Sequence, residues 1–145
     1  MTLYDTVVIG AGPGGMTAAM YAARSELKVL LLERGAPGGQ MNNTAEIENY
    51  PGYETIMGPD LSMKMYEPLE GLGVENAYGI VQNVTVNADG IKQVITEDED
   101  FEAKTVIIAT GAQHRNLNVP GEEEYGCRLY TTDAADDHTS VENVG

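Results

Sequence analysis

The 145 residues of this chain suffice for one domain with its own hydrophobic core and leave no space for a second complete domain. Acidic residues outnumber basic ones by 23 to 8, and the formal charge of −15 disfavours nucleic acids and anionic membranes as partners. The N-terminus carries neither a basic segment nor a separate apolar stretch. We therefore expect no signal peptide, no transmembrane helix and a cytoplasmic location.

The first third of the chain is predicted to be strand, helix, strand and then a long loop. The expected elements are a strand over residues 4–9, a helix over 13–25, a strand over 28–32 and an irregular segment over 35–58. A structureless loop of that length is uncommon unless it wraps something, and a cofactor is the natural candidate.

The remaining elements are a second helix and several strands. Leu61, Met65 and Leu69 lie on one face of a predicted helix over residues 60–70. The apolar run at 105–109 is typical of a buried parallel strand. Between them we expect a strand at 73–77 and an antiparallel meander at 80–86, 91–96 and 101–103, with a turn at 88–90.

Three glycines at the junction of the first strand and the first helix have the GxGxxG spacing of dinucleotide sites. Gly10 would permit a tight turn, Gly12 a close approach of a pyrophosphate, and Gly15 close packing of the helix on the sheet. The helix N-terminus would attract the anion, and Pro13 has no N–H to lose there. An ordinary glycine-rich turn in a βαβ unit is the competing interpretation.

Glu33 ends the second predicted strand at about the expected distance of ~20 residues from this motif. Its carboxylate could accept hydrogen bonds from both hydroxyls of a ribose, and it would repel a 2′-phosphate. The residues therefore predict NAD or the ADP half of FAD as the ligand, and they disfavour NADP at this position.

Three segments resemble the FAD-binding part of bacterial low-molecular-weight thioredoxin reductases, which are class II pyridine nucleotide-disulfide oxidoreductases. The segments are IGAGPGGMTAAMYAAR near the N-terminus, LLERGAPGGQMNNTAEIENYPGY at 31–53 and VIIATGAQHRNLNVPGEEEYG at 106–126. The resemblance implies an α/β, Rossmann-like three-layer domain, with a parallel sheet, helices on one face and an antiparallel β-meander on the other. It also implies that residues 1–126 form an FAD-binding domain.

The same resemblance implies which residues contact FAD. Gln40 would reach toward the flavin and Asn49 would lie beside the isoalloxazine ring, although Asn49 also suits a plain loop before Pro51. Val81 would offer main-chain groups to adenine. The full set is Gly10, Gly12, Pro13, Gly14, Gly15, Glu33, Arg34, Gly38, Gly39, Gln40, Asn49, Val81, Ala109, Thr110 and Gly111.

No catalytic residue and no metal site is predicted. Cys127 is the only cysteine, so a CxxC pair cannot form within this sequence, and His138 lacks further ligands. His114 and Arg115 are interpreted as hinge residues of the family rather than as proton-transfer groups.

The implied activity is that of an NADPH-dependent thioredoxin-disulfide reductase, which passes a hydride from NADPH to FAD and electrons on to a disulfide of thioredoxin. The resemblance also implies a homodimer. The NADPH and CxxC domain of the family is absent from this sequence, and residues 127–145 are interpreted as an acidic polar tail, a candidate remnant of the segment that returns to the FAD domain. A flavin-binding module without turnover and an NAD-linked oxidoreductase domain remain as alternatives.

Overall fold

The computed structural model describes residues 2–113 and 115. The chain divides into two units, Met1–Gly111 and Ala112–Gly145, and every helix and strand described below belongs to the first. His114, Cys127, His138, the acidic tail at 127–145 and the predicted domain boundary at residue 126 lie outside the described residues.

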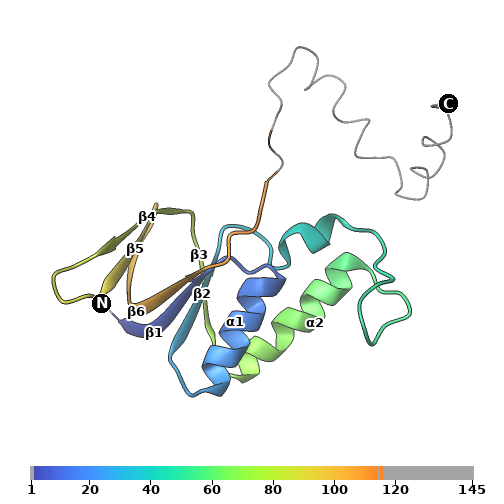
Figure 1. The fold of residues 1–145 in the computed structure, drawn as a ribbon, viewed down its shortest axis with the longest axis horizontal. Coiled ribbons are helices and arrows are strands. Elements are labelled where there is room, and N and C mark those ends of the chain that lie inside the picture. Colours follow the sequence, from blue (N-terminus) through green and yellow to red (C-terminus); the bar gives the residue numbers. More distant parts are fainter. Residues whose placement is uncertain (1, 114, 116–145) are drawn as a thin grey trace, which may run out of the picture. The chain divides into compact units, whose positions relative to one another are not determined.

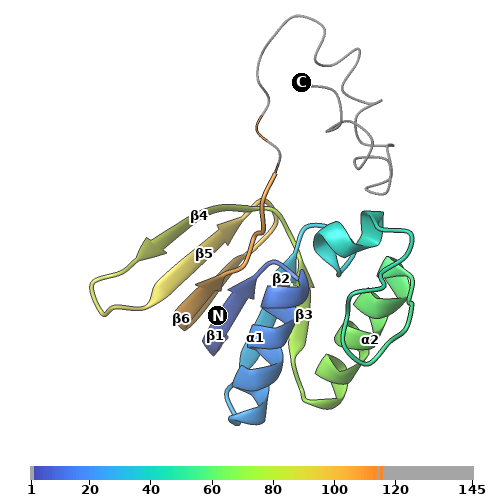
Figure 2. The ribbon, with the colours of Figure 1, turned by 45° about the vertical axis from the view of Figure 1, so that its right-hand side comes forward.

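The described elements follow the predicted order, as Figure 1 shows. They are β1 (Leu3–Ile9), α1 (Pro13–Arg24), β2 (Val29–Glu33), a 3₁₀ helix η1 (Gly39–Asn43), α2 (Gly58–Gly71), β3 (Glu75–Tyr78), β4 (Val81–Val86), β5 (Lys92–Thr96) and β6 (Asp100–Ile108). The strands form one sheet in the order β3-β2-β1-β6-β5-β4 (Figure 2). β1 pairs in parallel with β2 and β6, β2 pairs in parallel with β3, and the pairs β4–β5 and β5–β6 are antiparallel. The α/β, Rossmann-like fold class is confirmed.

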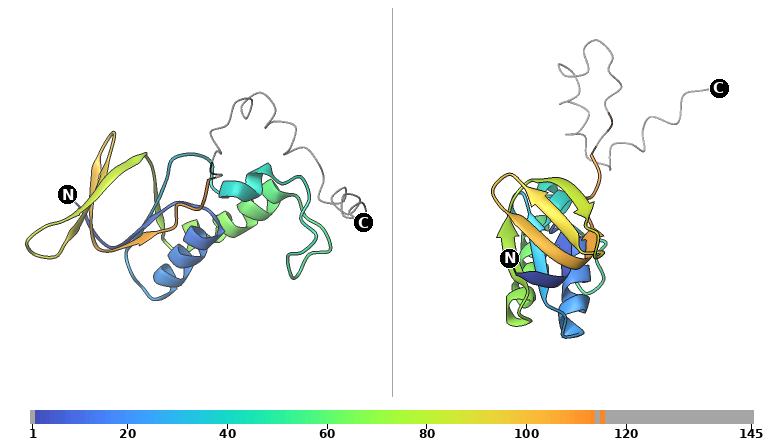
Figure 3. Two further views of the ribbon diagram at one scale, coloured as in Figure 1. Left: turned by 45° about the horizontal axis from the view of Figure 1, so that its top comes forward. Right: turned by 90° about the vertical axis from the view of Figure 1, so that its left-hand side faces the viewer.

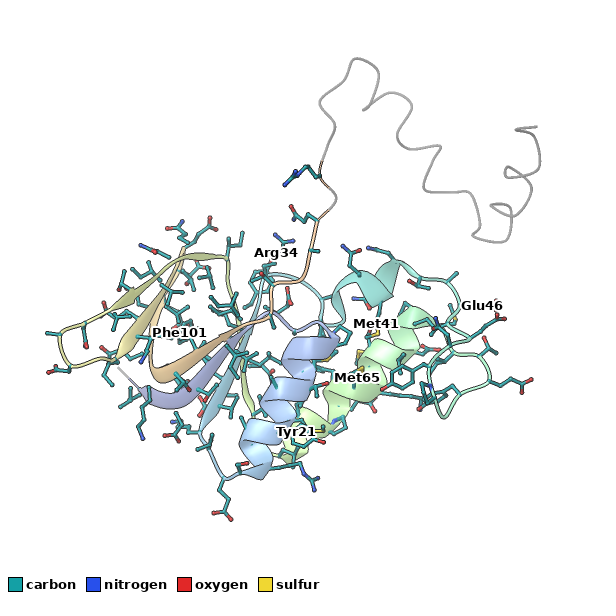
Figure 4. All side chains as sticks on the ribbon, in the orientation of Figure 1. Tyr21, Arg34, Met41, Glu46, Met65 and Phe101 are labelled. Carbon is teal, nitrogen blue, oxygen red and sulfur yellow. The ribbon has the colours of Figure 1, made fainter. Side chains whose placement is uncertain are left out.

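Side chains of alternating residues cover the two faces of the parallel strands. Val8, Val29 and Leu31 pack against α1 and α2, together with Met16, Ala19 and Leu69 of the helices. On the other face, Val7, Ile9, Leu30 and Leu32 pack against Val94 and Phe101 of the meander. Figure 3 shows the helices and the meander on different sides of the central strands, and Figure 4 labels Phe101 on the meander side. This arrangement provides the three predicted layers.

β6 differs from the prediction in two ways. Residues 101–103 and 105–109 were expected to be separate strands, but Asp100–Ile108 is one strand, which joins the meander to the parallel sheet. The apolar run was also expected to be buried, whereas Ile107 is 38% exposed and Ile108 is 68% exposed. β5 pairs with β6 only as far as Ala103, and neither isoleucine belongs to the two core clusters, so the described residues cover these side chains only in part.

The segment predicted as an irregular loop contains regular structure. Residues 39–43 form η1, and Ile47 and Ile56 exchange two backbone hydrogen bonds of 2.8 and 3.0 Å. These bonds close an arm over residues 44–57 in which no residue is buried. At the end of the arm, α2 begins at Gly58, where a Cβ would overlap the carbonyl oxygen of Met41. η1 therefore packs tightly on the start of α2.

One hydrogen bond joins β1 to β3 across β2. The Tyr4 hydroxyl donates to Oε2 of Glu75 at 2.7 Å, and Lys28 Nζ lies 3.4 Å from Oε1 of Glu75. Burial and the neighbouring Glu75 carboxylate raise the pKa of Tyr4 to about 12. The hydrogen bond from Tyr4 lowers the pKa of the Glu75 carboxyl from its usual value.

Alkaline pH is expected to destabilise the fold through Tyr4. Because the folded-state pKa lies above the ordinary value of 10.0, the contribution of Tyr4 to the free energy of unfolding is fully present below pH 10.0 and is lost as the pH rises through about 12. Tyr4→Phe should flatten this part of the stability curve, whereas Tyr21→Phe on the exposed side of α1 should not. Urea denaturation across this range checks the prediction, and an equally steep curve for Tyr4→Phe would contradict it.

Candidate nucleotide site

The segment from Gly10 to Gly15, called the glycine loop below, joins β1 to the start of α1. It lies where the carboxyl ends of three parallel strands meet. Gly10 N donates to Leu32 O at 2.8 Å at the end of β2, and Ala109 N donates to Ile9 O at 2.8 Å beyond the end of β6. Nucleotide ligands of open α/β sheets bind outside this carboxyl edge. The fold therefore places the predicted motif at the edge where such a ligand would be bound.

Two glycines of the motif are required by close backbone packing. Gly10 has φ +102°, a left-handed conformation that side chains disfavour, and a Cβ there would overlap the carbonyl oxygen of Ala109. A Cβ on Gly15 would overlap the carbonyl oxygen of Gly10. Helix α1 can therefore sit directly on the loop only because residue 15 has no side chain.

Gly12 and Gly14 are different, because a Cβ at either position would meet no atom within 4 Å. Gly12 is the N-cap of α1, no side chain caps the helix, Pro13 is in its first turn, and that turn contains no acidic residue. Main-chain N–H groups and the positive end of the helix dipole thus border an open space. These features fit a diphosphate, whose oxygens need close approach to a backbone without side chains.

The carboxylate of Glu33 is bound by three main-chain amides. Ala11 N donates to Oε2 at 2.6 Å, while Arg34 N and Gly35 N donate to Oε1 at 2.8 and 3.1 Å. A carboxylate has about four acceptor positions. In this geometry it retains one position for a further donor, whereas the sequence led us to expect two ribose hydroxyls. The ribose contact itself stays a prediction.

The second glycine-rich segment lies against the first. Gly38 N donates to Ala11 O at 2.7 Å, and Gly38 is buried with φ +121°. A Cβ on Gly39 would lie 3.4 Å from Cα of Gly12. Gln40 is exposed on η1, where its Oε1 accepts a hydrogen bond from Asn43 Nδ2 at 3.2 Å. Residues 38–40 thus continue the surface formed by the glycine loop.

A cleft of about 280 Å³ adjoins the glycine loop and Glu33. Its walls come from the glycine loop, β2 with the turn that follows it, α2 and β3. The lining residues are Ala11, Leu31, Glu33, Gly35, Pro37, Tyr66, Asn76, Ala77 and Tyr78.

Comparisons with known proteins show which family the chain belongs to. The sequence profile of the pyridine nucleotide-disulphide oxidoreductase family matches residues 4–143. The chain belongs to this family. The thioredoxin reductase of Listeria monocytogenes is 52% identical over 126 residues, which cover 87% of this chain and 39% of the relative. That of Bacillus subtilis (strain 168) is 49% identical over 126 residues, covering 87% of this chain and 40% of the relative.

Solved structures show the same similarity. The crystal structure of Lactococcus lactis thioredoxin reductase aligns with a TM-score of 0.80 at 73% sequence identity, covering 86% of this chain and 41% of that one. The thioredoxin reductase of T. acidophilum aligns with a TM-score of 0.77 at 34% identity over 86% of this chain. This family member therefore spans about two fifths of the length of the relatives that it matches.

In this family member, sequence reasoning missed one wall of the cleft. Tyr66, Asn76, Ala77 and Tyr78 line it, and none of them was predicted as a site residue. The strand predicted at 73–77 contained a usable signal, because parallel strands end at the same edge. In the sheet, Tyr78 is the direct partner of Glu33.

Of the predicted site residues, only Glu33 is among the residues that line this cleft. Asn49 is exposed on the arm, and the side chain of Val81 packs into the meander core. Thr110 and Gly111 are exposed, as is Arg34 at the end of β2, which Figure 4 labels together with Glu46 on the arm. A second cleft of about 580 Å³ lies between the arm and α2, and its lining includes none of the predicted site residues.

Among the described residues, no helix has both the length and the apolar composition that a membrane span requires. No group of three or more His, Cys, Asp or Glu side chains among the same residues is placed to hold a metal ion.

Proposed function

We propose that this chain is the FAD-binding part of an NADPH-dependent thioredoxin-disulfide reductase. The observation that carries the proposal is the open space beside Gly12 at the uncapped start of α1, next to the Glu33 carboxylate. Identity of about one half to thioredoxin reductases supports the same assignment.

The proposed roles follow the order of the cofactor. The N-terminus of α1, from Gly12 to Gly15, holds the pyrophosphate, and Glu33 contacts the adenosine ribose. Gly38 and Gly39 pass along the ribityl chain toward Gln40. When bound, FAD would supply the two-electron transfer between NADPH and a disulfide. Weaker assignments are Asn49 beside the isoalloxazine ring, main-chain groups at Val81 for adenine, and Ala109, Thr110 and Gly111 on the far side of the flavin.

The activity of the whole protein is proposed from the names of the relatives and from the family resemblance. On the same grounds we propose that thioredoxin is its partner and that it forms a homodimer. Because the thioredoxin system keeps cytosolic thiols reduced, the proposal also places the protein in the cytoplasm. These 145 residues include one cysteine, so they cannot by themselves cycle between a dithiol and a disulfide. That count favours a second candidate, a flavin-binding module that does not turn over alone.

Reconstitution tests the proposal. The purified chain, mixed with excess FAD and passed over a gel-filtration column, should elute with the visible absorbance of bound oxidised flavin. FMN, which lacks the ADP half, should not be retained under the same conditions. A colourless chain after treatment with FAD would contradict the proposal. Steady reduction of thioredoxin by this chain with NADPH would exclude the module without turnover.

A further inference from the structure

The Glu33 carboxylate joins two segments that lie far apart in the sequence. Its hydrogen bonds with Arg34 N and Gly35 N are local and shape the turn after β2. Its hydrogen bond with Ala11 N spans 22 residues and ends in the middle of the glycine loop. One side chain therefore couples the end of β2 to the loop that follows β1.

The main-chain N–H of Ala11 depends on Glu33 for its hydrogen-bond acceptor. The residue is 1% exposed, and a buried amide without an acceptor would be costly. At 2.6 Å, the bond from Ala11 N to an ionised carboxylate is of the short, charge-assisted type. On its other side, the carbonyl of Ala11 accepts the hydrogen bond from Gly38 N. Fixing Ala11 thus fixes the contact between the two glycine-rich segments as well.

We propose that Glu33 is a positioning residue, which holds the glycine loop in its ligand-binding conformation in addition to contacting a ribose. The proposal deepens the proposed function and rests on it only for the effect on FAD affinity. The coupling itself is a property of the protein alone, because the carboxylate and its three amide donors all belong to this chain.

Two substitutions of Glu33 separate its local bonds from its long-range bond. In Glu33→Gln one oxygen is replaced by an NH₂ donor, which cannot accept hydrogen bonds from main-chain amides. Glu33→Asp keeps both oxygens on a side chain one methylene shorter, which can still bond the amide two residues on, as Asp does in turns, but does not reach Ala11. Glu70→Gln, an exposed glutamate on α2, is the matched control.

Amide hydrogen exchange of the full 145-residue chain, followed by NMR without added nucleotide, tests the proposal. Glu33→Gln keeps one carbonyl oxygen, which can accept from Ala11 N or from the amides of the turn after β2 but not from both, so either Ala11 or Gly35 should exchange about tenfold faster than in the unmodified chain. In Glu33→Asp, Ala11 should exchange faster while Gly35 stays as protected as before. Glu70→Gln should change none of these rates. With FAD added, both Glu33 variants should bind about tenfold more weakly.

Unchanged exchange at Ala11 in Glu33→Asp would overturn the positioning role, as would an equal acceleration throughout β1 and β6, which would indicate only a general loss of stability. The two proposals fail in different ways. Faster exchange at Ala11 in a chain that retains no flavin would support the positioning role and remove the proposed function. Normal exchange at Ala11 in a Glu33 variant that loses FAD binding would remove the positioning role and support the proposed function.

Discussion

Gly12→Val is expected to abolish FAD binding without unfolding the chain. Gly12 has φ −73° and ψ 178°, an extended conformation that valine readily adopts, and a Cβ there meets no protein atom within 4 Å. The added branches would instead fill the space in which we place the pyrophosphate. Steric exclusion of this size corresponds to a loss of affinity of about 100-fold or more.

Flavin fluorescence titration and thermal unfolding measure the two parts of this prediction. Gly71→Val is the matched control, because a Cβ at Gly71, as at Gly12, meets no atom within 4 Å, and Gly71 is exposed at the end of α2 away from the glycine loop. We expect the control to bind FAD normally and both variants to unfold near the temperature of the unmodified chain. Normal FAD binding by Gly12→Val would show that the diphosphate lies elsewhere.

Local signals account for the parts of the fold that were predicted. Strand β1, helix α1 and strand β2 follow from hydrophobic runs separated by glycines and a small-residue helix. The face of α2 follows in the same way, since Leu61 and Leu69 are buried and Met65 packs against the core cluster that contains Leu69. These features depend on residues close in sequence, so periodicity and turn chemistry suffice to find them.

The continuity of β6 could not be predicted in this way. Its partner β1 lies about a hundred residues earlier, and the Thr6 and Thr105 hydroxyls, 2.7 Å apart, are 99 residues apart in the sequence. The run at 105–108 is apolar whether or not a neighbouring strand covers it, so sequence alone does not report the exposure of Ile108. Burial of a strand side chain depends on which elements pack on its face of the sheet, and such contacts are long-range.

The ligand contacts of the predicted site residues stay a prediction, and the internal contacts of the site were not predicted from the sequence. Glu33 was recognised because a carboxylate at the end of the second strand has a known use, but its bonds to main-chain amides carry no residue signature. The missed wall around Tyr66 and Tyr78 follows from the pairing of β2 with β3 and from the packing of α2. Neither the bonds of Glu33 nor this wall can be predicted without the three-dimensional arrangement of the elements.

Gly15→Ala should lower the free energy of unfolding, whereas Gly12→Val should leave it unchanged and lose FAD binding. The new Cβ would overlap the carbonyl oxygen of Gly10, which is backbone and cannot rotate away. α1 would have to move off the loop, which itself is tied to the end of β2 by the bond from Gly10 N to Leu32 O. Overpacking of this kind costs about 3 kcal/mol or more, which exceeds the gain of about 1 kcal/mol from replacing glycine within a helix.

Gly14→Ala isolates the steric effect, because the neighbouring position in the same helical turn has no atom within 4 Å of the added Cβ. We expect its free energy of unfolding to stay unchanged or to rise by up to about 1 kcal/mol. Urea denaturation of both variants, with unchanged slopes, measures the difference. Equal stability of Gly15→Ala and Gly14→Ala would mean that α1 can shift along the sheet at little cost. In that case the close seating of α1 on the glycine loop would not be what sets the geometry of the nucleotide site.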